Sequence, residues 1–230
     1  MFRSSCLLAF AVALGTPLSL RAEEKGKEIF NGKDLDGWVA EGAKEYKDKD
    51  DGNKTKPIWT VEDGLLKCAG HGYGFLRYTK QEYADFALHV EYRMTKSTPI
   101  CNSGIGIRTT AYDPKKDPET RPSFYSYEIQ LLDDAGKPAN DHGSGSLYRY
   151  VAPKENAVKP APEWNTVDVE CVGPHIKITI NGKEVIDTDQ SKIEEIKNKP
   201  LKGYVCLQVH GGKLDFRNVR IREIKAEKDK

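Results

Sequence analysis

Residues 124–134 read FYSYEIQLLDD, and their pattern decides the fold class. Apolar and polar side chains alternate with the period of a β-strand, so one face meets a core and the other meets water. The apolar face is formed by Tyr127, Ile129 and Leu131. Glu128 and Gln130 point the other way and stand about 6–7 Å apart. The stretch therefore predicts a sheet that is apolar on one side and can address a small polar ligand on the other.

Asp133 would lie on the opposite face of a regular strand. One inserted bulge residue would return its carboxylate to the side of Glu128 and Gln130. The stretch then has the pattern E-x-Q-x-x-D on a bulged strand. The competing interpretation is an ordinary solvated strand face, so other parts of the chain must decide between them.

The chain has 230 residues, which is compatible with one domain. Residues 1–22 have the features of a secretory signal, with Arg3 at the start and an apolar core at 7–14, LLAFAVAL. That apolar run is too short to span a bilayer as a helix. We therefore expect an exported protein, periplasmic or extracellular, with a single domain over residues 23–230 and no membrane attachment after signal cleavage. An uncleaved amino-terminal anchor is the alternative.

Charge and cysteine usage exclude several classes of function. The chain carries 36 Lys and Arg against 35 Asp and Glu, a balance that offers no electrostatic footprint for nucleic acid or an anionic membrane. Export permits disulfides between the remaining cysteines, which are Cys68, Cys101, Cys171 and Cys206. Cys171 and Cys206 lie in strand-like runs, where we expect a buried free thiol at least as much as a disulfide bridge. No C-x-x-C pair occurs, which argues against a cysteine zinc site.

Two earlier stretches alternate like the first. Residues 86–94, FALHVEYRM, place His89, Glu91 and Arg93 on a polar face that lines a groove or forms the outside of the sandwich. Residues 102–109, NSGIGIRT, place Gly104, Gly106 and Arg108 opposite the apolar isoleucines. Glycine weakens a strand unless something approaches its backbone closely. An arginine beside two glycines suits a recessed anionic or carbonyl-oxygen site, and a surface arginine paired with an acid is the alternative.

Later stretches add further polar candidates. Residues 203–210, GYVCLQVH, put Gln208 and His210 on the face opposite the valines and leucine. The connection at 135–162 is long for a compact domain, so we expect it to form a wall of a site that carries Tyr148. Residues 191–199, SKIEEIKNK, fit one short helix that begins with a capping box.

About a dozen short strands with regular turns and one short helix predict an all-β fold, an antiparallel β-sandwich of jelly-roll type. A groove on such a sheet collects polar side chains from several strands. The candidates for this groove are Arg108, Glu128, Gln130, Gln208 and His210. Side chains suited to acid, base and carbonyl recognition lie on separate strands, and together they are stronger evidence for a site than each one alone.

Several segments, taken in order, resemble one family. They are IFNGKDLDGW, WTVEDGLL, NSGIGIR, YEIQLLDD, GSLY, EWNTVDV and LQVHGGKLDFRNVRI. The ordered set resembles the 3-keto-disaccharide hydrolase family over residues 28–224. The resemblance implies a concanavalin A-like sandwich that acts, as a lyase or hydrolase, on glycosides already oxidised to a ketone at sugar carbon 3. Matching motif positions point to Arg108, Glu128, Gln130 and His210.

Chemistry on such a substrate assigns roles to these residues. A 3-keto group acidifies the hydrogen on carbon 2, so Glu128 or His210 would act as base and the other as acid. Arg108, with Gln130 or Gln208, would stabilise the enolate oxygen. Further substrate contacts are expected from Tyr148, Glu91 and Asp133. No residue is assigned to a metal, although a divalent cation is an open alternative for stabilising the enolate. No nicotinamide motif appears, so an upstream sugar 3-dehydrogenase would supply the substrate.

Two other classes of function compete with this interpretation. A retaining glucanase uses two carboxylates about 5 Å apart, usually from E-x-D-x-x-E, whereas Gln130 and the shorter Asp133 replace the last two acids here. A non-catalytic, lectin-like sugar-binding module would stack sugars on exposed aromatic rings, for which Tyr73, Tyr148 and Trp164 are candidates.

Overall fold

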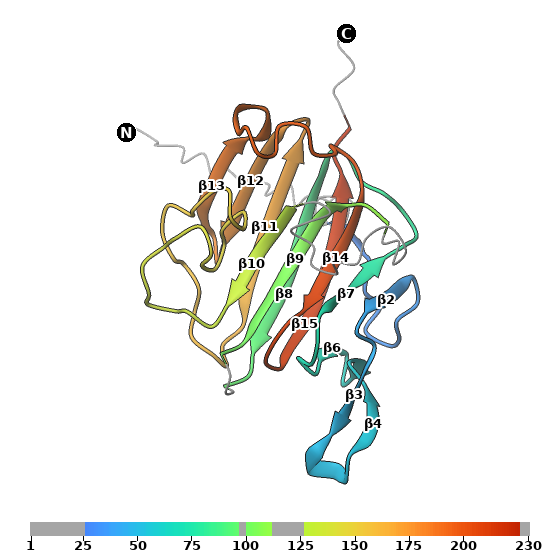
Figure 1. Ribbon diagram of the computed structural model, residues 1–230. Helices are drawn as coiled ribbons and strands as arrows, with labels where there is room; N and C mark the ends of the chain where they lie inside the picture. The colour runs from blue at the N-terminus through green and yellow to red at the C-terminus, as the bar shows by residue number, and fades with distance from the viewer. Residues whose placement is uncertain (1–25, 97–99, 112–126, 226–230) are drawn as a thin grey trace, which may run out of the picture.

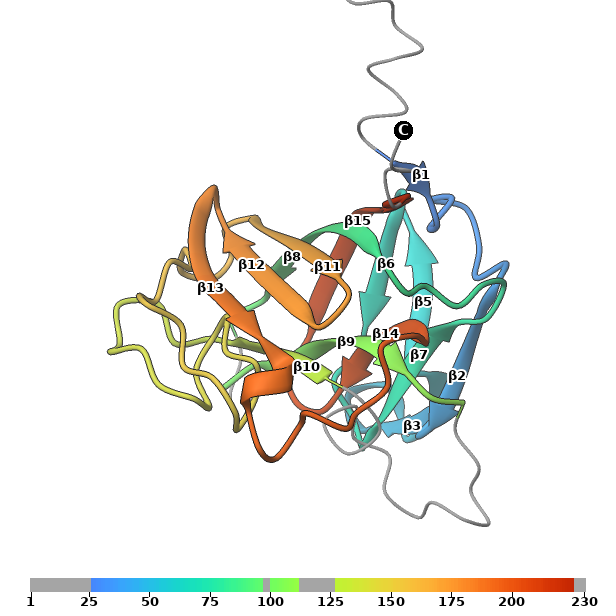
Figure 2. The same cartoon turned by 90° about the horizontal axis from the view of Figure 1, so that it is seen from above.

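The computed structural model describes residues 26–96, 100–111 and 127–225, and within them the chain forms two antiparallel sheets packed face to face (Figures 1 and 2). The predicted all-β sandwich is confirmed. The predicted signal, at residues 1–22, lies outside the described residues. None of the described residues forms a helix that is long and apolar enough to cross a bilayer.

The large sheet has eight strands in the order β13-β12-β11-β8-β15-β6-β5, with β1 beside β15. Its strands are β1 (Lys27–Glu28), β5 (Trp59–Glu62), β6 (Leu65–Cys68), β8 (Phe86–Met94), β11 (Asn165–Val172), β12 (His175–Ile180), β13 (Lys183–Asp189) and β15 (Leu214–Glu223). The small sheet has five strands in the order β10-β9-β14-β7-β2. Its strands are β2 (Trp38–Gly42), β7 (Gly74–Tyr78), β9 (Asn102–Thr109), β10 (Tyr127–Leu132) and β14 (Tyr204–Val209). The hairpin of β3 (Glu45–Asp48) and β4 (Lys54–Pro57) projects from one end (Figure 1).

The core lies between the inner faces of the two sheets. Every second residue of β8 is buried, beginning with Phe86, as the alternation predicts. The small sheet contributes Ile105, Ile107, Ile129 and Leu131, each 0% exposed. Burying an aliphatic side chain of this size contributes about 1.5–3 kcal/mol, so the paired alternating strands supply much of the stability.

Two tight turns follow directly from the sequence. β5 and β6 are joined by Asp63 and Gly64, whose φ angles are 53° and 76°. β12 and β13 are joined by Asn181 and Gly182, with φ angles of 50° and 80°. Positive φ at both central residues is the hairpin geometry that Asp-Gly and Asn-Gly favour, since it matches the twist of the strands.

The predicted helix at 191–199 is shorter than the capping-box pattern indicates. The structure has a 3-10 turn at Gln190–Lys192, followed by turns in which the amides of Ile196 and Lys197 donate to the carbonyl of Ile193. The capping side chain is Asp189, whose Oδ1 accepts from the backbone amide of Ser191 at 2.9 Å. The capping residue therefore lies two residues earlier than predicted and closes only one turn.

The thiols of Cys68, Cys101, Cys171 and Cys206 are all buried and free. Burial raises the pKa of Cys171 and Cys206 to about 12, so both thiols are neutral near neutral pH. Of the two arrangements left open by the sequence, the structure has the buried thiol.

Truncating a core side chain of the small sheet should destabilise the protein. Ile105→Ala is expected to lower the free energy of unfolding by about 2–5 kcal/mol, because Ile105 is fully enclosed and its removal leaves a cavity. Urea denaturation monitored by tryptophan fluorescence measures the change. Val172→Ala is the control, since Val172 is 42% exposed and its truncation should cost less than about 0.5 kcal/mol. Equal losses in the two variants would contradict this placement of the core.

Candidate functional site

The outer face of the small sheet gathers polar side chains in rows that cross its strands. In the first row, Glu128 of β10 lies opposite Gly106 of β9, Gly106 lies opposite Cys206 of β14, and Cys206 lies opposite Arg77 of β7. In the next row, Gln130 lies opposite Gly104, and Gln208 lies opposite Phe75. The predicted grouping of Glu128, Gln130 and Gln208 on one face is therefore what the strand pairing produces.

The two glycines of β9 form a floor between the flanking strands. A Cβ atom on Gly104 would lie 2.5 Å from Oε1 and 2.7 Å from Cγ of Glu128. The Glu128 side chain therefore lies over Gly104 and leans toward β14, and it is only 3% exposed. Glycine at this position leaves the space that the carboxyl group occupies.

The predicted wall of the site lies against β10. The amide of Tyr148 donates to the carbonyl of Glu128 at 2.8 Å, and the amide of Gln130 donates to the carbonyl of Ser146 at 3.1 Å. The connection at 135–162 thus adds a short extended segment to the sheet edge and sets Tyr148 beside Glu128. The Gln130 amide nitrogen donates to Oδ1 of Asn102 at 3.4 Å, which holds its side chain along the face.

Gln208 carries a polar atom that has no hydrogen-bond partner among the described residues. The side chain is 2% exposed, and among the described residues nothing hydrogen-bonds its Oε1. Buried polar atoms are nearly always paired, so an unpaired one on a polar face indicates a place for a ligand or a water molecule. The side-chain amide of Gln208 is therefore available for binding.

His210 lies at the far end of the same face. It follows β14, and its ring centroid is 4.9 Å from that of Tyr73. Cys206 is level with Glu128, so strand geometry places the His210 backbone about 13 Å along the sheet and about 10 Å across it from Glu128. The predicted acid and base share a face, but a ligand must lie between them.

Arg108 does not lie on this face, contrary to the prediction. Its φ angle is 53°, and the ladder between β9 and β14 shifts register between Tyr204 and Cys206. Such an irregularity reverses the direction of the side chain, which is 0% exposed and donates from Nε and Nη2 to the carbonyl of Ala84. Arg108 is buried inside the sandwich near Asp85, at 3.8 Å, and serves the structure there.

Among the described residues, the polar face carries Arg77, which the sequence reasoning missed. Its guanidinium donates to both carboxylate oxygens of Glu41 at 2.6–3.1 Å and lies 4.5 Å from the ring centroid of Tyr204. Burial alone lowers the pKa of Arg77, but the hydrogen bond to Glu41 and the charge of Glu41 outweigh burial and the pKa is raised. The alternation of residues 74–78, GFLRY, could have indicated this arginine, because it points Arg77 to the face away from the apolar Leu76.

Cys206 lies in the middle of the face but is not a nucleophile. Burial raises the pKa of its thiol to about 12, although a hydrogen bond from Thr109, 3.4 Å away, acts in the other direction. A neutral thiol attacks poorly, so the site has no cysteine chemistry near neutral pH.

Two further predicted residues do not join the site. Glu91 lies on β8 of the large sheet, where its carboxylate binds Arg217 at 2.7 Å and Asn218 at 2.6 Å. Asp133 follows β10, whose pairing with β9 runs without a register shift from Tyr127 to Leu132. The bulge that would bring Asp133 beside Glu128 is not present in that ladder, so the E-x-Q-x-x-D set is not assembled.

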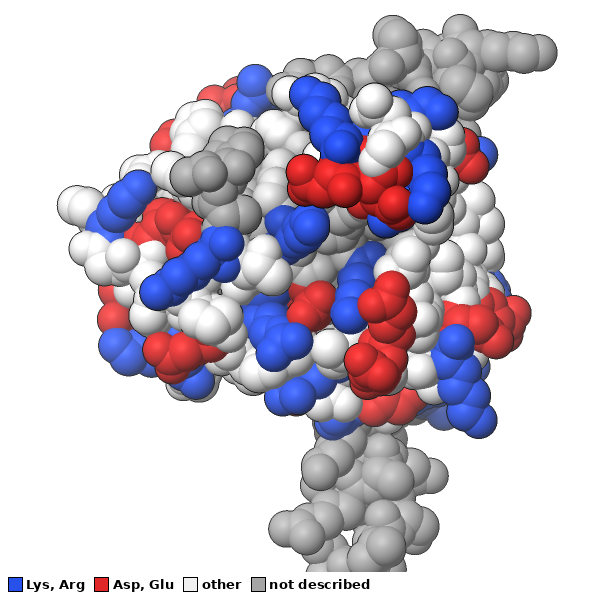
Figure 3. Space-filling view, turned by 90° about the horizontal axis from the view of Figure 1, so that it is seen from below, with Lys and Arg blue, Asp and Glu red and all other residues white. Residues whose placement is uncertain are grey.

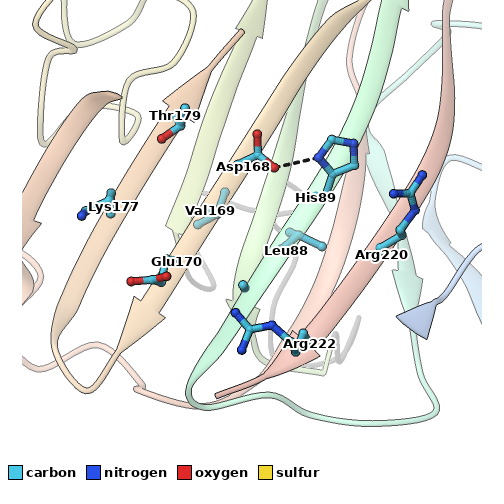
Figure 4. Close-up of a pocket in the computed structure, with 10 residues that line it drawn as sticks. Leu88, His89, Asp168, Val169, Glu170, Lys177, Thr179, Arg220 and Arg222 are labelled. Carbon is cyan, nitrogen blue, oxygen red and sulfur yellow. Dashed lines mark hydrogen bonds and ion pairs between the residues drawn. The ribbon is translucent and has the colours of Figure 1, made fainter. Parts of the chain in front are cut away.

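A separate hollow of about 310 Å³ lies on the outer face of the large sheet. Its lining comes from β8, β11, β12 and β15 and includes His89, whose ring lies between Asp168 and Arg220 (Figure 4). The His89 Nδ1 is 2.7 Å from Oδ1 of Asp168. None of the predicted site residues lines this hollow, and we do not assign the chemistry to it.

The pair of His89 and Asp168 predicts a pH-dependent contribution to stability. The hydrogen bond to Asp168 raises the pKa of His89 above its usual value, against the effect of burial. The stabilisation is therefore complete below the pKa of an unfolded histidine and is lost as the pH rises through the folded value. Asp168→Asn should lower stability by less than about 1 kcal/mol at about pH 6 and by almost nothing at about pH 9. Urea unfolding at both pH values measures this, and a difference that grows with pH would contradict it.

The described residues contain no group of three or more His, Cys, Asp or Glu side chains that could hold a metal ion. Charges of both signs are interspersed at the end of the molecule shown in Figure 3, where Asp and Glu lie beside Lys or Arg over the described surface. A surface of mixed charge suits a neutral ligand better than a polyanion.

The glycine floor predicts the effect of adding one methyl group. Gly104→Ala should displace the Glu128 side chain, because the new Cβ would lie 2.5 Å from its Oε1. We expect ligand binding or turnover to fall at least about tenfold while the unfolding transition shifts little. Gly64→Ala is a poor control, because Gly64 has a φ of 76° and alanine would be strained there. Ala87→Gly on the large sheet serves as the control instead. Full activity in Gly104→Ala would contradict a role for this floor.

The fold and its polar face define an antiparallel sandwich of the galectin-like class. A carbohydrate-binding module of Bacillus subtilis, CBM66, shares the fold with a TM-score of 0.54 at 15% identity over 81% of this chain and 96% of that one. Two crystal structures of proposed glycosyl hydrolases from Parabacteroides distasonis are closer, with TM-scores of 0.66 and 0.64 at 25% and 27% identity. They cover 89% and 86% of this chain and 98% of each of theirs.

The particular family follows from the sequence profile. The 3-keto-alpha-glucoside-1,2-lyase-like domain matches residues 25–222, and the chain belongs to this family. A Bacteroides thetaiotaomicron protein named 3-keto-disaccharide hydrolase is 25% identical over 234 residues, which cover 84% of this chain and 77% of that protein. The predicted family is thereby confirmed.

Proposed function

We propose that this protein is an exported enzyme that cleaves the glycosidic bond of 3-keto-glycosides by elimination and hydration. The observation that carries the proposal is the Glu128 carboxyl, held over the glycine floor of β9 on the same face as Gln208, whose Oε1 has no partner among the described residues. Family membership and the name of the Bacteroides thetaiotaomicron relative support the substrate class.

The reaction needs a base, an oxyanion partner and an acid. The base takes the proton from carbon 2, and the electron pair of that C–H bond forms an enolate whose charge rests on the oxygen at carbon 3. The enolate then reforms the ketone while the bond from carbon 1 to the glycosidic oxygen breaks, and that oxygen takes a proton from the acid. Water next adds its hydroxyl to carbon 1 and a proton to carbon 2. The net change is hydrolysis, with no oxidant or reductant consumed.

Glu128 is assigned as the base because it is recessed, backed by a fixed sheet and aimed over open backbone. Gln208 and Gln130 are assigned to the ketone and hydroxyl oxygens, since their amides lie in the next row of the same face. His210 is assigned as the acid, because it lies at the end where a leaving group would project. Arg108 has no part in this scheme, because it is buried inside the sandwich.

The cellular setting is part of the proposal. The signal-like residues 1–22 support export to the periplasm or the cell exterior. Because the proposed mechanism starts from a ketone, another protein of the sugar 3-dehydrogenase type must make it. The balanced charge of the chain supports a neutral carbohydrate as partner rather than nucleic acid.

A non-catalytic sugar-binding module is the second candidate. Exposed Tyr73, at 56%, and half-buried Tyr148 border the polar face, and aromatic rings of this kind bind sugars without chemistry. The retaining glucanase is less well supported, because Asp133 is not brought beside Glu128 by a bulge.

Proton NMR in heavy water with 3-keto-trehalose, and with trehalose as control, tests the proposal. We expect cleavage of the keto sugar alone, with deuterium entering carbon 2 of the hydrated product. Glu128→Gln should reduce turnover at least about a hundredfold, as expected for loss of a general base. Glu194→Gln is the matched control, since Glu194 is 82% exposed and should leave turnover unchanged.

The outcomes separate the two candidates. Binding of sugar without turnover would favour the binding module. Cleavage of trehalose itself would overturn the elimination mechanism, because that sugar has no ketone to acidify carbon 2.

A further inference from the structure

An exposed aromatic ring borders the far end of the polar face. Tyr73 precedes β7 and is 56% exposed, and its ring centroid is 4.9 Å from that of His210. The Ile100 carbonyl lies 4.0 Å from where a Cβ on Gly211 would be, and Ile100 is 53% exposed. An exposed aromatic ring therefore lies beside the assigned acid, and an exposed apolar residue is close to the glycine that follows it.

The backbone that carries Tyr73 is held firmly although its ring is exposed. The Tyr73 carbonyl accepts from the amide of Ala43 at 2.8 Å. Gly70 touches the loop after His210 so closely that a Cβ would lie 2.0 Å from the carbonyl oxygen of Gly212. An aromatic side chain fixed in this way gives up little conformational entropy when a ligand covers it.

A second aromatic pair lies close to Tyr73 in the chain. His71 stacks on Tyr46, with centroids 4.2 Å apart and an angle of 14° between the rings. Tyr46 belongs to β3, so the projecting hairpin lies beside the end of the face that carries Tyr73. The stack of His71 on Tyr46 therefore lies two residues along the chain from Tyr73.

The distance between Tyr73 and Glu128 suits a ligand of more than one ring. Gly74 lies opposite Val209 and Arg77 opposite Cys206, so Tyr73 is about 13 Å along the sheet and about 14 Å across it from Glu128, measured between backbones. The side chains shorten this span, because Glu128 leans over Gly104 and Tyr73 leans toward His210. A single sugar ring held at Glu128 would leave Tyr73 uncovered.

We propose that Tyr73 is the platform for the second, unoxidised sugar of a disaccharide substrate, the ring that leaves when the glycosidic bond breaks. This inference rests on the proposed function. The apolar C–H face of that ring stacks on Tyr73, and its glycosidic oxygen faces His210, which donates the proton. The platform makes the enzyme favour disaccharides over glycosides with a small alcohol in the same place.

The test compares two substrates in one variant. Tyr73→Ala should lower kcat/KM for 3-keto-trehalose about tenfold, a change of about 1.4 kcal/mol in transition-state binding. The same variant should leave kcat/KM for methyl 3-keto-α-glucoside unchanged, because that substrate has no second ring. Tyr73→Phe should keep the disaccharide activity, and Val172→Ala, a truncation of an exposed residue on the large sheet, is the control.

Each result decides the matter. An equal loss on both substrates would show that Tyr73 only positions His210, and no loss on either would show that it does not meet substrate; both overturn the platform. A protein that cleaves neither keto sugar refutes the proposed function, and the platform is then tested by NMR titration with trehalose. If trehalose causes chemical-shift changes that vanish in Tyr73→Ala, Tyr73 binds a sugar ring even though the protein is not the proposed enzyme. Shift changes that persist in Tyr73→Ala, or that never occur, would refute the platform.

Discussion

The absence of side chains at Gly104 and Gly106 is the constraint on which the polar face depends. β9 runs between β10 and β14, so any side chain there would fill the space above the sheet between Glu128 and Gln208. With glycine, the Glu128 side chain lies flat over backbone instead of standing into solvent, and it becomes buried without leaving the surface of the sheet. The strand loses stability through its glycines, and the packed isoleucines on its other face, Ile105 and Ile107, offset that loss.

The polar side chains on the two outer faces of the sandwich are paired differently, and this difference helps to distinguish a binding site from a solvated surface. On the large sheet, Glu91 is bonded to Arg217 and Asn218, and His89 to Asp168, so these charged groups satisfy one another, although Nε of Arg222 has no partner among the described residues. On the small sheet, Gln208 keeps a buried oxygen that no described residue bonds. Unsatisfied buried polar atoms cost free energy unless a ligand or water completes them. A ligand or water molecule on the small sheet would therefore gain a hydrogen bond to the Gln208 oxygen.

Alternation in the sequence predicted the fold class and the parity of each strand, that is, which of its residues point to the core and which to the outer face. This placed Glu128, Gln130 and Gln208 together. Parity does not identify the sheet to which a strand belongs, so Glu91 was grouped with residues on the opposite side of the molecule. Parity also fails wherever the register shifts. The irregularity at Tyr204–Cys206 turned Arg108 inward, and the expected bulge near Asp133 is not found in the β9–β10 ladder. Arg77 was visible in its own alternation, but its importance depends on β7 lying beside β14, which only the pairing reveals.

The inward turn of Arg108 and the outward position of Arg77 have a common physical consequence for the site. A guanidinium stabilises the charged form of a carboxyl beside it and so weakens that carboxyl as a base. Arg77 is instead occupied by Glu41, in a pair whose side chains are 11% and 10% exposed, and it lies at the level of Glu128 with two strands between them. Among the described residues, the charge of Arg77 is thus neutralised by Glu41, and the amides of Gln130 and Gln208 lie in the row next to Glu128. Such an arrangement favours a neutral, hydroxyl-rich ligand, and in the proposed mechanism the ketone of that ligand raises the acidity of the proton that Glu128 accepts.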